Sequence, residues 1–61
     1  MVRTAIVKLG NGTYFKRMDG YRSQREMAED LRGNGYRVAK IFNGDKTDEE
    51  LEEWLFWNRK I

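Results

Sequence analysis

The chain has 61 residues, a net charge of +2 and 39% hydrophobic residues, and it contains neither cysteine nor histidine. Because so short a chain buries only about 60% of its unfolded surface, we expect one small domain over residues 1–61. The missing side chains exclude disulfides, zinc sites built on thiolates or imidazoles, and catalysis that depends on either group. No apolar run approaches the roughly 20 residues of a membrane helix and no signal peptide is predicted, so we expect a cytoplasmic location.

Charge is distributed unevenly along the chain. Residues 1–44 contain nine basic and four acidic residues, which gives a net charge of +5. Residues 45–61 contain three basic and six acidic residues, which gives −3 and accounts for the total of +2. The pattern predicts a basic body followed by an acidic terminal segment.

The first elements that the sequence predicts are two strands joined by a tight turn. Residues 2–9 alternate in polarity and are rich in β-branched side chains, which is typical of a strand. Asn11-Gly12 is the strongest short-range hairpin signal, since a type I′ turn needs positive φ at both central positions. This turn would pair Leu9 with Tyr14. It would also bring five apolar side chains to one core face, namely Ala5, Val7, Leu9, Tyr14 and Met18.

A helix is predicted next, over residues 24–32. Ser23-Gln24-Arg25-Glu26 has the form of a capping box, in which a hydroxyl and a carboxylate satisfy free backbone N–H groups. The apolar residues of this helix form a narrow stripe that suits packing on a sheet, consisting of Met27, Ala28 and Leu31. Residues 36–42 return to alternation. One face of that third strand would carry Tyr36, Val38, Lys40 and Phe42, and the other Arg37, Ala39 and Ile41.

The last predicted element is a helix over residues 48–59. Thr47-Asp48-Glu49-Glu50 is a second capping box, and its acidic groups lie favourably near the positive end of the helix dipole. The order of elements is therefore β-β-α-β-α, an α+β domain. We expect a three-stranded sheet in the order 2-1-3, with both helices packed on the face that carries Ala5, Val7 and Leu9. The alternative order, 1-2-3, would place the charged Lys16-Arg17 segment in the centre.

The last helix carries the first candidate binding surface. With Leu51 at zero and about 100° per residue, Trp54, Leu55 and Trp57 belong to a stripe that can face the sheet. Phe56 falls at about 140°, on the opposite side. Its charged neighbours there are Glu49, Glu52, Glu53, Arg59 and Lys60. Aromatic residues rimmed by charge are typical of protein interfaces, so we expect Phe56 and the edge of Trp57, with the three glutamates, to bind a protein partner or a second copy. The alternative is a single exposed apolar residue without a function.

The second candidate surface is a basic face of the hairpin. Its residues are Lys8, Phe15 and Arg17, with Arg3 and Arg37 at flanking positions. Cations interleaved with an aromatic ring are what single-strand nucleic-acid binders use, since the charges contact phosphates and the ring stacks on a base. The alternative is a solvated face whose cations protect an edge strand against aggregation.

No stretch of the sequence predicts catalysis. Neither glycine-rich turn opens a helix with Lys-Ser or Lys-Thr, and residues 43–50 lack the ligand spacing of an EF-hand. The acidic groups gather on a solvated helix face, which is typical of surface charge and not of a catalytic acid or base. We therefore expect a small non-enzymatic regulator or inhibitor without a cofactor, metal, small-molecule substrate or membrane contact. Nucleic-acid binding through the hairpin is the alternative.

Overall fold

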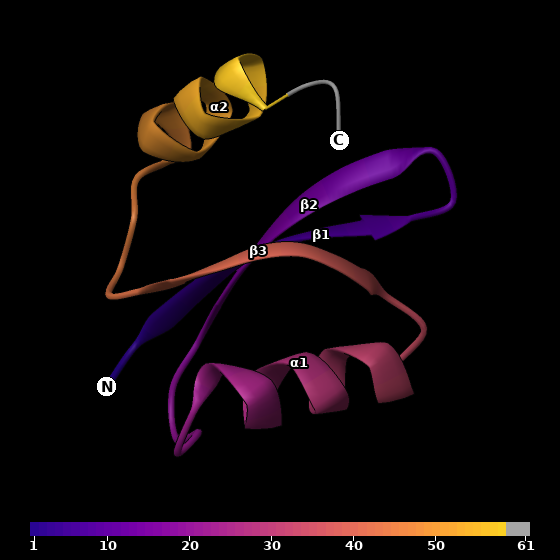
Figure 1. The fold of residues 1–61 in the computed structure, drawn as a ribbon, viewed down its shortest axis with the longest axis vertical. Coiled ribbons are helices and arrows are strands. Elements are labelled where there is room, and N and C mark those ends of the chain that lie inside the picture. Colours follow the sequence, from indigo (N-terminus) through magenta and orange to yellow (C-terminus); the bar gives the residue numbers. More distant parts are fainter. Residues whose placement is uncertain (59–61) are drawn as a thin grey trace.

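The sheet and both helices lie within residues 1–58, the part of the chain that this computed structural model describes (Figure 1). The elements are β1 (Arg3–Leu9), β2 (Gly12–Met18), α1 (Gln24–Gly33), β3 (Arg37–Asn43) and α2 (Asp48–Trp57). Strand β1 lies between β2 and β3 and is antiparallel to both. The α+β class and the strand order 2-1-3 are thus confirmed. The last helix is observed as far as Trp57, and the part predicted at Arg59 lies outside the described residues.

The hairpin turn differs from the one predicted. Leu9 pairs with Gly12 and Val7 with Tyr14, so the turn is centred on Gly10 and Asn11. Gly10 has φ +61° whereas Asn11 has no positive φ, which is the pattern of a type II′ turn with glycine at its first central position. The predicted type I′ turn at Asn11-Gly12 is therefore wrong. Since the register shifts by two residues, every side chain of the hairpin still points to the face that was expected.

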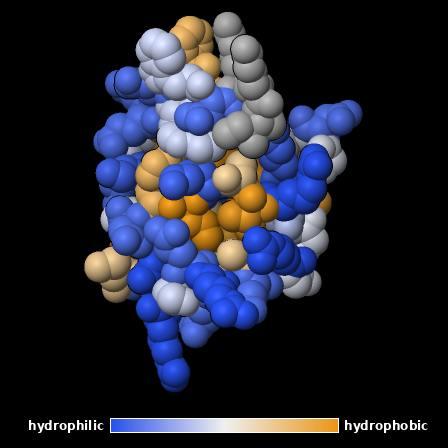
Figure 2. Space-filling view, in the orientation of Figure 1, coloured by the Kyte–Doolittle hydropathy of each residue, from blue (hydrophilic) through white to orange (hydrophobic). Residues whose placement is uncertain are grey.

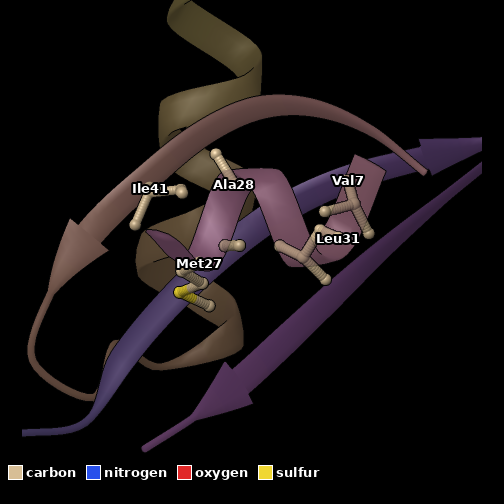
Figure 3. Close-up of a cluster of buried hydrophobic side chains, with 6 residues drawn as sticks. Val7, Met27, Ala28, Leu31 and Ile41 are labelled. Carbon is tan, nitrogen blue, oxygen red and sulfur yellow. The ribbon is translucent and has the colours of Figure 1, made fainter. Parts of the chain in front are cut away.

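The main hydrophobic core lies between α1 and one face of the sheet. The α1 stripe Met27, Ala28 and Leu31 packs there against strand residues that include Val7 and Ile41 (Figure 3). Ala5 completes this cluster of buried residues. Leu9 and Tyr14, at the tip of the hairpin, are 48% and 49% exposed. The predicted core face is correct, but it is buried only where α1 covers it.

The other face of the sheet is covered by α2. Thr4 and Ile6 alternate with the core residues of β1, so they point away from α1, yet both are 0% exposed. Phe42 pairs with Thr4 on that face, and its ring meets the ring of Trp54 edge-on with centroids 6.1 Å apart. Leu51 of α2 is also 0% exposed. The helices lie on opposite sides of the sheet, as Figure 1 shows, and the expectation that both pack on one face is wrong. Because β1 is apolar on both faces, each face needs a cover of its own.

An irregularity in β3 changes which of its side chains share a face. Val38 pairs with Val7 and Lys40 with Ile6, so Ala39 is an extra residue in a β-bulge. The bulge brings Val38 to the same face as Ile41, against the α1 core. Lys40 and Phe42 point to the α2 face instead. The predicted grouping of Val38 with Lys40 and Phe42 is therefore wrong, because strict alternation does not cross a bulge.

Side-chain hydrogen bonds fix the points at which the helices begin. The Ser23 hydroxyl accepts the Glu26 N–H at 3.1 Å, and the Thr47 hydroxyl accepts the Glu50 N–H at 3.2 Å. Both N-terminal caps are the ones that the sequence predicts. These caps define the first turn of each helix.

The buried hydroxyl of Thr4 holds the segment between β3 and α2 against the sheet. Thr4 Oγ1 donates to the carbonyl oxygen of Gly44 at 2.8 Å and accepts the N–H of Lys46 at 3.0 Å. A buried hydroxyl with both roles satisfied avoids the cost of an unpaired polar group. The chain is thereby led across the end of the sheet to the face that α2 covers.

Candidate protein-binding surface

The outward side of α2 exposes two adjacent aromatic rings. Phe56 is 57% exposed and Trp57 is 75% exposed. Their ring centroids are 5.4 Å apart at an interplanar angle of 87°, which is the favoured edge-to-face arrangement. Trp57 is more exposed than its position on the helical wheel indicates, because α2 contacts the sheet through Leu51 and Trp54. The structure thus presents Phe56 and Trp57 as one aromatic pair.

The acidic residues predicted to flank this pair are exposed on the same helix. Glu49, Glu52 and Glu53 are all on the surface, and none of them forms an ion pair within residues 1–58. Their charges are therefore not compensated by the described part of the chain. Arg59 and Lys60, which the sequence places near Phe56, lie outside the described residues.

A hollow of about 310 Å³ lies beside the aromatic pair, between the end of β3 and α2. Three aromatic rings line it, those of Phe42, Trp54 and Trp57. Three charged residues also line it, namely Lys46, Glu50 and Glu53. Lys46 Nζ lies 3.8 Å from Glu50 Oε2. The sequence did not predict this hollow, because it forms only when α2 lies on the Phe42 face of the sheet.

Two of the predicted nucleic-acid-binding cations are bound within the protein. Arg17 donates to the carbonyl oxygen of Lys46 and to the carboxylates of Asp45 and Asp48 at 2.6 to 3.0 Å. The hydrogen bond to Asp48 raises the pKa of Arg17 further above its ordinary value. Arg3 donates to the backbone carbonyl of Tyr21 and to the Asn43 side chain. Both side chains therefore tie strands to neighbouring loops.

The remaining residues of the hairpin surface lie near one another. Lys8 pairs with Arg37 across β1 and β3, and both line a hollow of about 270 Å³. Phe15 pairs with Ile6 and so lies on the same face as Lys8, but it is half-buried. The structure thus brings Lys8 and Arg37 together and separates Arg3 from them. Sequence reasoning missed Lys40, whose ammonium nitrogen lies 5.6 Å from the centre of the Phe42 ring.

Surface contacts explain the shifted pKa values of Asp19 and Tyr21. The amino-terminal ammonium, 2.9 Å from Asp19 Oδ1, lowers the pKa of that carboxyl. The Tyr21 hydroxyl donates to the carboxylate of Asp30, which raises the pKa of Tyr21. Neither group lines the hollow beside α2. Within residues 1–58 no group of acidic side chains is arranged to hold a metal ion.

Figure 2 shows how hydrophobic side chains are distributed on the face seen in Figure 1. They gather in the middle of the view, where β3 crosses between the two helices, and hydrophilic side chains surround them. Neither helix of the described chain has the length and apolarity needed to cross a membrane. Comparison with protein-family models, curated proteins and solved structures finds no match to this chain. A function for it therefore has to be argued from its own surface.

Proposed function

We propose that the protein is a small, non-enzymatic, cytoplasmic regulator or inhibitor that binds a protein partner through the outward side of α2. The observation that carries this proposal is the exposed edge-to-face pair of Phe56 and Trp57. Large aromatic side chains supply most of the energy at many protein interfaces when they are buried by a partner. The pair would form the centre of the interface.

The acidic side chains of α2 support a choice of partner. Glu49, Glu52 and Glu53 are exposed on the same helix as the aromatic pair, and none of them forms an ion pair in the described chain. Uncompensated charge at the rim of an interface accelerates association with an oppositely charged surface and disfavours partners of like charge. The partner is therefore a protein with a basic surface around an apolar groove.

The test compares three alanine variants against one partner. The partner is first identified by cross-linking from cell extract and is then purified, so that its affinity is measured directly. Phe56→Ala and Trp57→Ala should each weaken binding by more than about 1 kcal/mol, about a fivefold loss, while the melting temperature changes little. Tyr14→Ala is the matched control, because Tyr14 is 49% exposed but lies on β2. Equal affinities for Phe56→Ala and the parent chain would refute the proposal.

A second copy of the chain is the partner to examine first. Equilibrium sedimentation over about a hundredfold range of concentration reveals even a weak dimer by mass action. A dimer that Phe56→Ala dissociates would identify the protein as its own partner. A dimer that this variant leaves intact would place the self-association elsewhere.

Nucleic-acid binding is the second candidate function, and the neighbouring cations Lys8 and Arg37 favour it. Because Arg3 and Arg17 are bound within the protein, fewer cations are available for phosphates than the sequence indicates. Phosphate contacts make affinity fall steeply with salt, whereas an aromatic interface is far less sensitive. Titration with single- and double-stranded oligonucleotides at low salt tests this candidate, and no binding there would reject it.

A further inference from the structure

We propose that the hollow between β3 and α2 binds the arginine side chain of a basic peptide segment. The proposal rests on the protein-binding function proposed above and specifies the group of the partner that is recognised. The hollow has a volume of about 310 Å³, near the lower end of the range of about 300 to 1,000 Å³ found for ligand pockets. It opens beside Trp57, so a partner that covers the aromatic pair also reaches the hollow.

The rings in the hollow suit a cation. Phe42 and Trp54 meet edge-to-face at 88°, and Trp57 adds a second indole to the lining. The face of an aromatic ring attracts a cation, most strongly for tryptophan, and arginine is the cation found there most often. The chain already uses one of these rings in that way, since the Lys40 ammonium lies 5.6 Å from the Phe42 ring centre.

The charge of the hollow agrees with the same ligand. Two carboxylates and one ammonium line it, which gives a net charge of −1. The ammonium of Lys46 lies 3.8 Å from the carboxylate of Glu50, so these two charges compensate each other. The carboxylate of Glu53 has no ion pair within residues 1–58 and remains for an incoming cation.

Arginine fits this combination better than lysine does. A guanidinium is planar, so it can stack on an indole ring while its N–H groups donate to a carboxylate in the same plane. An ammonium is a compact and strongly hydrated charge that cannot make both contacts with one flat surface. Trp54 or Trp57 would provide the ring, and Glu53 would provide the carboxylate.

The test uses N-acetyl-arginine amide as the probe and N-acetyl-citrulline amide as its neutral isostere. Isotope-labelled full-length protein is titrated with each, and the indole N–H signals of Trp54 and Trp57 are followed by NMR. Both signals should shift saturably with the arginine probe, and the citrulline probe should bind at least about threefold more weakly. Equal binding of the two probes, or no saturable shift with arginine, would overturn the proposal.

Two charge variants sharpen the test because they act in opposite directions. Glu53→Gln should weaken binding of the arginine probe about threefold, and Glu29→Gln on α1 should leave it unchanged as the matched control. Lys46→Gln should tighten binding about twofold, because it removes a like charge and releases Glu50. Damage to the fold cannot produce a tighter complex. Weaker binding by Lys46→Gln, or equal losses for Glu53→Gln and Glu29→Gln, would contradict the assignment.

The probe is a small molecule, so failure of this inference can be told from failure of the proposed function. If the arginine probe does not bind but Phe56→Ala still weakens the protein partner, only the assignment of the hollow is overturned. If the probe binds as expected and Phe56→Ala leaves partner affinity unchanged, the hollow is supported and the aromatic interface is refuted.

Discussion

Shortening Ile6 should destabilise the domain strongly, because the sheet is covered on both faces. Ile6 is 0% exposed on the α2 face of the central strand. Ile6→Ala removes three carbon groups, which at about 0.8 kcal/mol each correspond to about 2.4 kcal/mol. The cavity that remains adds to this loss, so we expect about 3 kcal/mol in all. Ile6→Val removes one carbon group and should cost about 1 kcal/mol.

Leu9→Ala is the matched control for this prediction. It removes the same number of carbon groups from the same strand, but Leu9 is 48% exposed, so it should cost less than about 1 kcal/mol. Urea unfolding followed by tryptophan fluorescence and by circular dichroism gives the free energy of unfolding of each variant. For a domain of this size, 3 kcal/mol corresponds to a fall in melting temperature of roughly 12 to 24 °C. Equal losses for Ile6→Ala and Leu9→Ala would mean that α2 does not cover this face.

Four further variants test individual features of the structure. Gly10→Ala should lower the free energy of unfolding by about 1 kcal/mol or more, because Gly10 has φ +61°. Gly12→Ala should lower it less, because the new methyl group would contact only the exposed ring of Tyr14. The contact with Asp30 raises the pKa of Tyr21, so it stabilises the fold at pH values below the ordinary tyrosine pKa of about 10. This stabilisation is lost as pH rises through the raised pKa of Tyr21 in the folded protein. Ultraviolet titration should therefore show a lower tyrosine pKa in Asp30→Asn. Arg17→Met should lower the melting temperature and make the melting temperature less sensitive to salt, because Arg17 forms ion pairs with Asp45 and Asp48. A salt dependence equal to that of the parent chain would contradict this prediction.

Local signals in the sequence predicted the elements and their order. Capping residues and alternation act over a few neighbours, so Ser23, Thr47 and the apolar run of β1 could be interpreted without a structure. The run Ala5-Ile6-Val7 also indicated a central strand. It did not show that one helix would pack on each of its two faces. The face on which α2 packs depends on the short connection between β3 and α2, and the hydrogen bonds of that connection to Thr4 form only in the folded protein.

The contacts that the sequence could not show join residues far apart in the chain. Arg17 binds Asp45 and Asp48, which lie 28 and 31 positions away in the chain. A cation that the sequence offered for phosphate binding therefore forms contacts within the fold. The exposure of Phe56 follows from its helical angle, which is a local property. The hollow beside it needed the position of Phe42 on β3, and a one-residue bulge had changed the face on which that ring lies.

The bulge at Ala39 also affects how the open edge of β3 can pair with another chain. Strand β3 is an edge of the sheet, and apolar side chains gather where it crosses the surface in Figure 2. A long, regular and apolar edge invites another chain to add a strand, and such additions lead to fibres. The extra residue interrupts the register of this edge and increases its twist, so a straight incoming strand cannot follow it. The bulge that reverses the side chains of β3 therefore also disfavours the addition of a strand at this edge of the sheet.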